Sequence, residues 1–324
     1  MKLSIILPSY NNEKVIGEVL DSIFNQDYPK KDFEVLVIDG GSTDNTLEIS
    51  KKYPVKILNN PKKTEEPARI LGMDKAKGEI LIFVDTDNIL IGKDWLKKAL
   101  KPFEDKEIIF ADTLYFSYRK NDRIGVRYQG LIGGDDPIIM YLGLYSRWNY
   151  LKDDWTDCPH KDEDKGDYLK CKFLNKNKVP PMGSNGFLIR KKILKKVVKD
   201  SFIHSDIVYE LVNSGNNCFA KIKIGIVHNQ IVFFRKKIRR MERRKEGIKI
   251  KYNYGISRKK LVLTGLYLML VIPVLFDTLR GFVKKPNFAW FFHPIATFGE
   301  LFIYSWYFLR YKFDTNLKLS SANK

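Results

Sequence analysis

The stretch Glu79–Leu90, EILIFVDTDNIL, decides the fold class of this chain. An uninterrupted apolar run from Ile80 to Val84 stands directly before two carboxylates, Asp85 and Asp87. Such a run, preceded by Gly78 and followed by polar residues, is typical of a strand buried on both faces of a parallel sheet. Two anions separated by one residue repel each other, so the pair favours a cation bound beside them.

The composition is that of a folded, basic protein. The 324 residues are enough for one large α/β domain plus an appendage, and the apolar content of 44% is ordinary. Lys and Arg number 57 against 38 acidic residues, a net charge of +19. This excess indicates an anionic partner, which is a nucleic acid, a phospholipid surface or a phosphorylated substrate.

The cysteines and the N-terminus bear on the compartment. Cys158, Cys171 and Cys218 are irregularly spaced, so we expect reduced thiols and a reducing compartment. A zinc site on Cys158, His160 and Cys171 is not expected, because no fourth ligand follows at zinc-site spacing. The apolar run that ends at Pro8 is too short for a signal-peptide core, which predicts that the start of the chain stays in the cytoplasm.

The first hundred residues alternate strand and helix patterns. The expected strands are 3–7, 34–38, 55–58 and 80–84, and the expected helices are 15–24, 46–52 and 66–77. Repeated strand–helix–strand units predict a mainly parallel, Rossmann-like sheet with helices on both faces and ligands at the carboxyl ends of its strands. Three of those ends carry polar clusters, with the sequences PSYNNE, DGGSTDNT and DTDN.

The second hundred residues are less regular. From 112 to 181 the pattern loosens, and the charged stretch 153–170 is interpreted as a solvated insertion. Order returns at PPMGSNGFLIRKKIL, a Gly-bearing turn that leads into a strand and a helix. HSDIVYELVNSG then predicts a helix, and CFAKIKIGIVHNQ predicts an alternating strand.

The composition changes sharply after Asn229. Thirteen basic and two acidic residues lie between Arg235 and Lys260, followed by the uncharged run 261–276 and the aromatic-rich run 288–309. As helices, these two runs extend about 24 Å and about 33 Å, against a hydrocarbon core of about 30 Å. We expect two apolar membrane-associated helices, or a re-entrant or interface-lying hairpin, with Glu300 turned inward, protonated or near an interface.

The position of the basic segment selects among the anionic partners. Its charges directly precede a membrane-class apolar run, so a cytoplasmic leaflet is a more economical partner than nucleic acid. The positive-inside rule then places the remainder of the chain on the cytoplasmic side of the cell membrane.

The polar strand ends suit a metal and a diphosphate. With Asp39 at the end of a neighbouring strand, Asp85 and Asp87 can hold a divalent cation bound to a nucleoside diphosphate. Hard oxygen ligands favour Mg²⁺ or Mn²⁺. The alternative is that these aspartates serve only as turn or helix-cap residues after their strands.

Four motifs in one order carry a family resemblance. They are LSIILPSYNNEKVIGEVLDSIFNQDYP, VLVIDGGSTDNT, PARILGMDKAKGEILIFVDTDN and the later Gly-rich turn. Together they resemble the family 2 glycosyltransferases of the GT-A fold, inverting enzymes that use nucleotide-sugar donors. The resemblance is close over 2–100, returns over 182–228 and is weak in between. It implies a donor linked to UDP or GDP.

The resemblance assigns the nucleotide site. Asp39 matches the carboxylate that accepts hydrogen bonds from the base, and Arg69 matches an arginine near the pyrophosphate. Two departures stand out: Gly40 replaces a second aspartate, and Ile70 replaces a frequent asparagine. The other matched residues of the nucleotide motifs are Pro8, Tyr10, Glu13, Gly41 and Ser42.

The metal motif is matched by Asp85, Thr86 and Asp87. A cation held there would stabilise the departing nucleoside diphosphate as a Lewis acid. His228 resembles a histidine that adds a metal ligand in some GT-A enzymes, although a lone histidine can equally be structural.

The catalytic base is expected in the stretch HSD. Asp206 matches the second member of the family's acidic pair, Ser205 replaces the first, and His204 is the substitute candidate. The alternative role for Asp206 is a favourable interaction with the helix dipole. If the acceptor were a polyprenyl phosphate, its oxygen would already be anionic and no strong base would be needed.

Two further groups of residues follow from the resemblance and the charge pattern. Gly183, Ser184 and Asn185 match a turn that lies against the acceptor and the donor sugar, although glycines there can simply permit a tight backbone. Four arginines of the basic segment could bind donor phosphates or lipid head groups: Arg239, Arg240, Arg243 and Arg244.

These assignments divide the chain into three parts. Residues 1–229 are expected to form the GT-A domain, with a nucleotide-sugar-binding half at 1–111 and an acceptor-binding half at 112–228. Residues 230–260 form the basic juxtamembrane segment, and 261–324 hold the membrane helices and tail.

The expected function is sugar transfer to a membrane-presented, lipid-linked acceptor in glycan biosynthesis. Two rivals remain open: a nucleotidyltransferase acting on sugar phosphates, and a nucleotide-sugar-binding protein without transferase activity.

Overall fold

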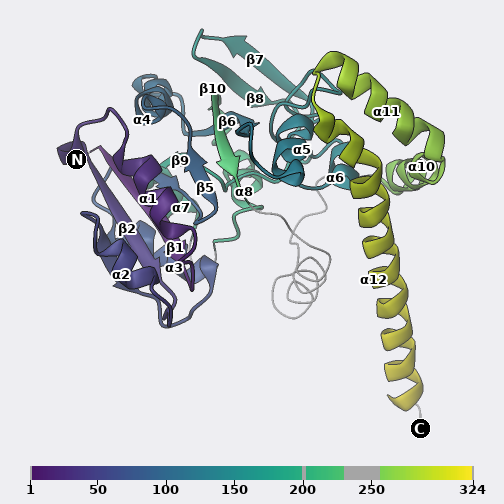
Figure 1. The fold of residues 1–324 in the computed structure, drawn as a ribbon, viewed down its shortest axis with the longest axis horizontal. Helices are drawn as coiled ribbons and strands as arrows, with labels where there is room; N and C mark the ends of the chain where they lie inside the picture. Colours follow the sequence, from purple (N-terminus) through teal and green to yellow (C-terminus); the bar gives the residue numbers. More distant parts are fainter. Residues whose placement is uncertain (1, 199–201, 230–255, 323–324) are drawn as a thin grey trace.

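The computed structural model describes residues 2–198, 202–229 and 256–322. Arg239, Arg240, Arg243 and Arg244 lie outside the described residues, as does most of the segment 230–260. The described part consists of one large sheet with helices on both faces and three C-terminal helices at one side (Figure 1).

Ten strands form the sheet, in the order β3-β2-β1-β4-β9-β6-β10-β8-β7, and the short β5 pairs with β10. Strands β1 to β4 are parallel to one another, and so are β6 and β10. The strands are β1 Leu3–Ser9, β2 Phe33–Asp39, β3 Lys56–Asn59, β4 Ile80–Phe83, β5 Asn88–Leu90, β6 Phe110–Ser117, β7 His160–Asp164, β8 Tyr168–Phe173, β9 Phe187–Arg190 and β10 Phe219–His228.

The expectation of a mainly parallel sheet holds for the first half of the chain only. Strand β9 enters antiparallel between β4 and β6, and β7, β8 and β5 add further antiparallel pairs. The sheet is therefore mixed. The chain returns to the sheet centre through the Gly-rich turn that precedes β9, which reverses its direction.

The helices agree with the expected positions in the first hundred residues. They are α1 Ile16–Phe24, α2 Thr46–Ser50, α3 Glu65–Lys75, α4 Trp95–Leu100, α5 Ile124–Ile132, α6 Pro137–Tyr141, α7 Lys191–Val197, α8 Ile207–Asn213, α10 Arg258–Met269, α11 Val271–Lys284 and α12 His293–Ala322, with short 3₁₀ helices η1 Lys30–Asp32, η2 Lys101–Glu104 and η3 Phe288–Phe292.

Both faces of the central strands are buried, as the continuous apolar runs predict. One face of β1 carries Leu3, Ile5 and Leu7 and is covered by α1 and α4. The opposite face carries Ile6 and is covered by α3, α7 and α8. Because residues alternate between the faces of a strand, burial on both sides requires an unbroken apolar sequence.

The charged stretch 153–170 is more structured than expected. It contains Trp155, which is fully buried, and continues into the β7–β8 hairpin at the sheet edge. The charged residues of β7 are exposed or half-buried there. Charged side chains protect such an edge from pairing with another chain. The stretch is therefore largely exposed to solvent, as interpreted, but it is an ordered edge hairpin anchored by Trp155, which was not expected.

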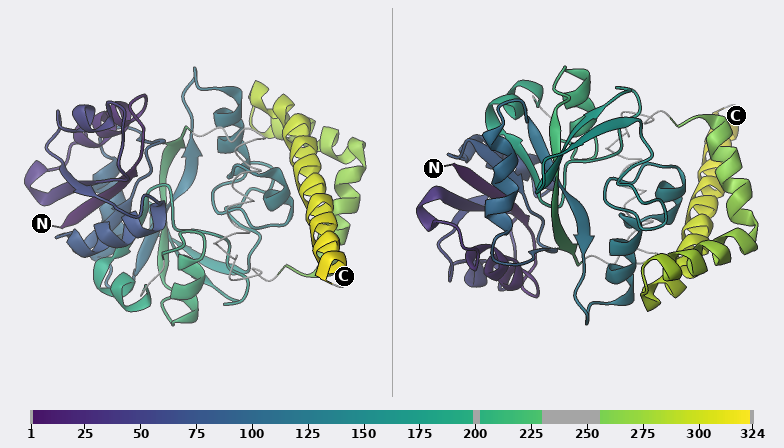
Figure 2. Two further views of the ribbon diagram at one scale, coloured as in Figure 1. Left: turned by 90° about the horizontal axis from the view of Figure 1, so that it is seen from below. Right: turned by 90° about the horizontal axis from the view of Figure 1, so that it is seen from above.

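The apolar run 261–276 is not one helix. It breaks at Leu270 into α10 and α11, whose axes differ by 84°. Among the described residues, no single helix has the length and apolar composition of a membrane span; only this bent pair reaches them jointly. Figure 2 shows α10, α11 and α12 together on one side of the molecule.

The C-terminal helices dock on α5 and α6 through buried polar contacts. The hydroxyls of Tyr128 and Tyr141 lie 2.6 Å and 2.9 Å from the two ring nitrogens of His293, at the start of α12. Tyr141 and Tyr267 both donate to Asp277 of α11, at 2.8 Å and 2.9 Å. These contacts fix the position of the C-terminal helices against the sheet domain.

Candidate active site

The loops after β1 and β2 lie side by side, as the parallel pairing of these strands predicts. Ser9 and Asp39 are register partners at the ends of β1 and β2. The Asp39 carboxylate accepts the backbone N–H groups of Gly41 and Ser42, at 2.9 Å and 3.0 Å, and the Ser42 hydroxyl at 2.6 Å. Asp39 is therefore held by its own loop, while the ring of Tyr10 beside it is 50% exposed.

Glu13 and Gly40 hold the loop after β1 close to the loop after β2. Glu13 accepts the backbone N–H and the side-chain amide of Asn45, at 3.1 Å and 3.0 Å, and so ties the β1 loop to the start of α2. A Cβ atom at Gly40 would lie 3.1 Å from the Lys63 carbonyl and 3.3 Å from Cβ of Tyr10. The aspartate expected at this position from the family has no room here unless the neighbouring loop shifts.

Arg69 is a buried side chain that pairs with Asp85, and it is not a surface charge. It is fully buried in α3, and its Nη2 donates to Asp85 Oδ1 at 2.6 Å. Glu65 forms a second ion pair with it, and the rings of Phe83 and Phe202 lie 5.9 Å and 5.7 Å from its guanidinium carbon. Burial raises the pKa of Asp85 although the Arg69 charge opposes this.

The second carboxylate of the motif meets the end of β10. His228 Nε2 lies 3.5 Å from Asp87 Oδ2, because β10 pairs with β5 and sets His228 opposite Asn88. The other ring nitrogen, Nδ1, lies 2.7 Å from the side-chain nitrogen of Gln129 in α5. Burial is the largest single influence and would lower the pKa of His228, but the nearby carboxylates, Asp87 first, together raise it.

These positions test the expected ligands Asp85, Asp87 and His228. The structure brings Asp87 and His228 together, whereas Asp85 is directed to Arg69. Across the described part of the chain, no three His, Cys, Asp or Glu side chains are grouped so that they could hold a metal ion. The expected three-ligand set is therefore not preformed.

Two protein ligands nevertheless fit Mg²⁺ or Mn²⁺, which keep waters and bind phosphate oxygens. Asp87 offers an oxygen and His228 a nitrogen at neighbouring points. For Nε2 to bind a metal, Nδ1 must carry the proton and donate to the Gln129 amide oxygen. A flip of that amide achieves this, and its two orientations differ only in the placement of O and N.

Asn88 joins the metal motif to the Gly-rich turn. Its side-chain oxygen accepts the Asp85 backbone N–H at 2.9 Å, and its amide nitrogen donates to Asp87 Oδ1 at 3.1 Å and to Asn185 Oδ1 at 2.9 Å. Asn88 is fully buried. Sequence reasoning quoted this residue within DTDN and gave it no role, although an asparagine directly after two aspartates was the available signal.

The Gly-rich turn packs against the segment that holds the expected base. At Gly183, φ is +131°, and a Cβ atom there would lie 2.2 Å from the His204 carbonyl oxygen and 2.2 Å from Cγ2 of Ile207. Any side chain at this position would separate the turn from α8. The backbone at position 183 thus needs a glycine, as the alternative explanation predicted. The same close approach sets the position of the segment 204–207, which includes Asp206.

Asp206 stands at the N-cap position of α8 and is 2% exposed. The Ser205 hydroxyl donates to its Oδ1 at 3.2 Å, and within the described residues its side chain accepts no capping hydrogen bond from α8. A base must reach the acceptor hydroxyl. Proton abstraction by Asp206 therefore requires the segment before α8 to move.

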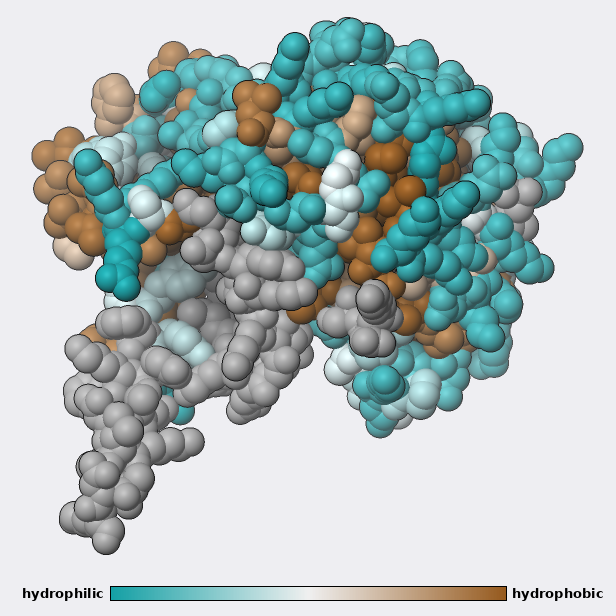
Figure 3. All heavy atoms as spheres, turned by 180° about the vertical axis from the view of Figure 1, so that it is seen from behind, coloured by the Kyte–Doolittle hydropathy of each residue, from teal (hydrophilic) through white to brown (hydrophobic). Residues whose placement is uncertain are grey.

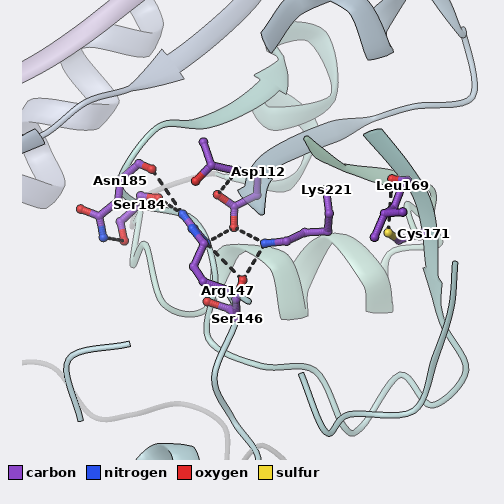
Figure 4. A network of polar contacts seen from close by, with 9 residues as sticks. Asp112, Ser146, Arg147, Leu169, Cys171, Ser184, Asn185 and Lys221 are labelled. Atoms are coloured by element: carbon purple, nitrogen blue, oxygen red, sulfur yellow. Dashed lines mark hydrogen bonds and ion pairs between the residues drawn. The ribbon is translucent and has the colours of Figure 1, made fainter. Parts of the chain in front are cut away.

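A buried ion cluster that the sequence analysis missed supports the same turn (Figure 4). Asp112 of β6 and Lys221 of β10 are register partners, and Lys221 Nζ lies 3.1 Å from the Asp112 carboxylate. Arg147 forms a second ion pair with this carboxylate, and its Nη2 donates to the backbone carbonyls of Ser184 and Asn185 at 3.4 Å and 3.3 Å. Asp112, Arg147 and Lys221 are all buried.

The only sequence signals for this cluster were charges within strand patterns. Asp112 interrupts the strand pattern FADTLYFS, and Lys221 interrupts the strand pattern CFAKIKIG. Arg147 lies in the region whose pattern was irregular, so nothing in the sequence associated it with the turn at Ser184.

The stability of the protein is expected to rise between about pH 8 and about pH 10.4, relative to the Lys221→Met variant. Burial lowers the pKa of Lys221 to about 8, against the opposing charge of Asp112. In the unfolded chain a lysine pKa is about 10.4, so the unfolded state binds more protons in this range and stability increases with pH. Urea unfolding of both proteins across this range measures the effect; parallel profiles would contradict it.

The chain is similar in sequence to a known protein family and to several characterised proteins. The family described as Glycosyl transferase family 2 matches residues 4–198. The Staphylococcus aureus poly(ribitol-phosphate) beta-N-acetylglucosaminyltransferase TarS is 29% identical over 230 residues, which cover 65% of this chain and 39% of the relative.

A second curated relative and a solved structure are also similar to this chain. The Methanococcus voltae dolichyl N-acetyl-alpha-D-glucosaminyl phosphate 3-beta-D-2,3-diacetamido-2,3-dideoxy-beta-D-glucuronosyltransferase is 35% identical over 109 residues, 32% of this chain and 34% of the relative. A solved mannosyltransferase, PcManGT from Pyrobaculum calidifontis with GDP-Man and Mn²⁺, matches 99% of this chain and 86% of its own, with a TM-score of 0.48 and 16% identity. The chain thus aligns with well under half the length of these two curated relatives.

Proposed function

Because the chain belongs to glycosyl transferase family 2, we propose that it moves a sugar from a UDP- or GDP-sugar to an acceptor presented at a membrane surface, with inversion at the anomeric carbon. The observation that carries this proposal is the hydrogen-bond network through Asn88. It joins Asp85 and Asp87 to Asn185, with His228 beside Asp87. In open α/β sheets, ligands bind at such carboxyl ends of the strands.

The residues at these strand ends divide the work of donor binding. The exposed Tyr10 ring and the loop around Asp39 hold the base, and Arg69 fixes Asp85 next to the diphosphate. Asp87 and His228 would hold a divalent cation, Mg²⁺ or Mn²⁺, which would supply Lewis-acid stabilisation for the departing nucleoside diphosphate. The Gly-rich turn positions the transferred sugar and the acceptor.

The burial of Asp206 supports an acceptor whose attacking oxygen is already anionic. A buried carboxylate is poorly placed to take a proton from a hydroxyl, whereas a lipid-linked phosphate needs no strong base. The names of two relatives contain poly(ribitol-phosphate) and dolichyl N-acetyl-alpha-D-glucosaminyl phosphate; they support an acceptor that contains phosphate, without identifying its attacking oxygen. Asp206 remains the proposed base if the acceptor is an alcohol.

Attachment to the cytoplasmic leaflet is supported by the C-terminal region. The basic segment 230–260 directly precedes α10, and the bent α10–α11 pair exposes many apolar side chains. Because α10 and α11 differ in direction by 84°, a hairpin lying in the interface fits better than two straight spans.

One assay separates this proposal from its rivals. Purified full-length protein is incubated with radiolabelled UDP- and GDP-sugars and with membranes, with and without EDTA. EDTA-sensitive release of nucleoside diphosphate, with label in the lipid fraction, is the expected result. Release of pyrophosphate from a nucleoside triphosphate would support a nucleotidyltransferase instead. Donor binding without turnover in any of these conditions would support a binding protein.

Arg147→Met is expected to lower kcat about a hundredfold, because Arg147 holds the carbonyls of the turn and a misplacement of about 1 Å costs this much. Lys221→Met is the matched control. It removes a cation from the same Asp112 carboxylate and also leaves one neutral pair, but within the described residues the Lys221 ammonium donates to Asp112 and to the Ser146 carbonyl, and not to the turn.

The comparison of these two variants isolates the turn from the ion cluster. Steady-state transfer rates at saturating donor are measured beside thermal unfolding of each variant. Arg147→Lys should recover part of the rate, since a lysine keeps the charge but not the forked donors. Equal rate losses in Arg147→Met and Lys221→Met would contradict a positioning role for Arg147.

A further inference from the structure

The C-terminal helices border a half-open cavity of about 480 Å³ that the proposed transfer site does not include. It lies between α6, α10 and α11 and the loop around Leu151. Its inner wall contains the buried side chains of Met140 and Leu151, together with the rings of Tyr141 and Tyr267.

The outer part of the same cavity is strongly basic. It is lined by Lys152, Lys259, Lys260 and Arg280, all of which are exposed. Lys152 lies 3.9 Å from Asp157, whereas Lys259, Lys260 and Arg280 form no ion pair with any described residue. A concave surface with one sign of charge concentrates counter-ions of the opposite sign.

One carboxylate lies in this cavity, and it is already engaged. Asp277 is 8% exposed and accepts the hydroxyls of Tyr141 and Tyr267 at 2.8 Å and 2.9 Å. The Asp277 carboxylate offsets one of the four cations of the lining. The four cations and this carboxylate leave a positive excess toward an incoming ligand.

The surface next to the cavity is apolar. On α10 and α11, Leu266 is 54% exposed, Ile272 80% and Phe276 64%. Figure 3 shows hydrophobic side chains gathered on the side of the molecule where these helices lie. Large apolar side chains exposed together on one side of a protein indicate an interaction site.

We infer that this cavity binds the phosphate head group of an anionic membrane lipid, with Lys259, Lys260 and Arg280 around the phosphate and the start of the hydrocarbon chain on the apolar wall. The combination of a basic opening, an apolar wall and an apolar flank excludes a purely polar anion as the best fit. This inference rests on the proposed attachment to a membrane, and it is independent of the transfer reaction.

Vesicle binding by the full-length protein tests the inference without any donor. The vesicles are phosphatidylcholine alone, or phosphatidylcholine with a minor fraction of phosphatidic acid. Replacing Lys259, Lys260 and Arg280 by Gln is expected to weaken binding to the anionic vesicles by about a hundredfold, because each basic residue near such a surface contributes a factor of about five. Replacing Lys97, Lys98 and Lys101 by Gln, which removes the same charge at α4 and η2, is expected to change it by less than about threefold.

A charge-neutral variant separates the cavity from general adsorption. Thr264 lines the cavity, and Thr264→Trp fills it while adding an interfacial aromatic residue. Weaker binding of anionic vesicles is expected, by at least about fivefold; unchanged or tighter binding would overturn the inference. Thermal unfolding of each variant confirms that it is folded.

Two further outcomes would also overturn the inference. Complete displacement of the vesicles by millimolar inorganic phosphate would mean that the cavity takes free phosphate and not a lipid. Self-association through the apolar flank, with no vesicle binding by the wild-type protein, would mean that a second copy covers this surface. Because no sugar nucleotide enters the assay, its result is independent of success or failure in the transfer assay.

Discussion

Asp87→Asn should abolish most of the sugar transfer activity while leaving the protein folded. The substitution keeps the size of the side chain and its neighbour Asn88, but removes the negative charge that faces His228 at 3.5 Å. Lewis-acid stabilisation of a leaving group is worth several kcal/mol, and about 1.4 kcal/mol corresponds to a factor of ten in rate. We expect kcat/KM to fall on the order of a thousandfold.

Mn²⁺ binding and donor turnover are measured side by side for this variant. Asp94→Asn is the matched control, because Asp94 makes an exposed ion pair with Lys98 at 2.6 Å and lies on a different loop. The control should match the parent protein in both measurements. If Asp87→Asn binds Mn²⁺ and donor as tightly as the parent and turns over equally fast, the assignment of this site is wrong.

Asp112→Asn should cause a large loss of stability. Asp112 is the shared partner of Arg147 and Lys221, and all three side chains are at most 3% exposed. Without the carboxylate, Arg147 is left as a buried charge with no counter-charge, and Lys221, whose pKa burial already lowers, loses the partner that holds its proton. Removing one partner of a buried ion pair costs about 3–5 kcal/mol, so we expect the free energy of unfolding to fall by about this amount.

Urea unfolding of the full-length chain measures the change. Adding Lys221→Met to Asp112→Asn removes a buried amine that has lost its carboxylate partner and should restore part of the lost stability. A loss no larger than that of Asp94→Asn, whose carboxylate is exposed, would show that Asp112 does not neutralise a desolvated cluster.

Much of the nucleotide-binding half could be predicted from local patterns. The run at 80–84 is apolar at every position and the run at 3–7 at every position but Ser4, and this pattern is typical of strands buried on both faces. Parallel strands place their carboxyl ends at one edge, so Asp39 and Asp85 had to lie at the same edge of the sheet.

The second half of the site could not be predicted in this way. Strand β9 enters antiparallel, and the hairpin β7–β8 forms from a stretch dominated by charges. In both cases the pairing partner decides the structure, because cross-strand neighbours and burial outweigh the preferences of an individual segment. The break at Leu270 is another example, since residues on either side of it are equally apolar.

The sequence by itself determined the strand and helix order of the first hundred residues, the polar strand ends and the concentration of basic residues before an apolar tail. Only the tertiary structure decided that Arg69 binds Asp85, that Asn88 reaches Asn185, and that Arg147 holds the turn beside it. These contacts join residues far apart in the chain, up to 97 positions for Asn88 and Asn185. A buried polar group must find a partner wherever packing places one, and no local pattern in the sequence records which partner that will be.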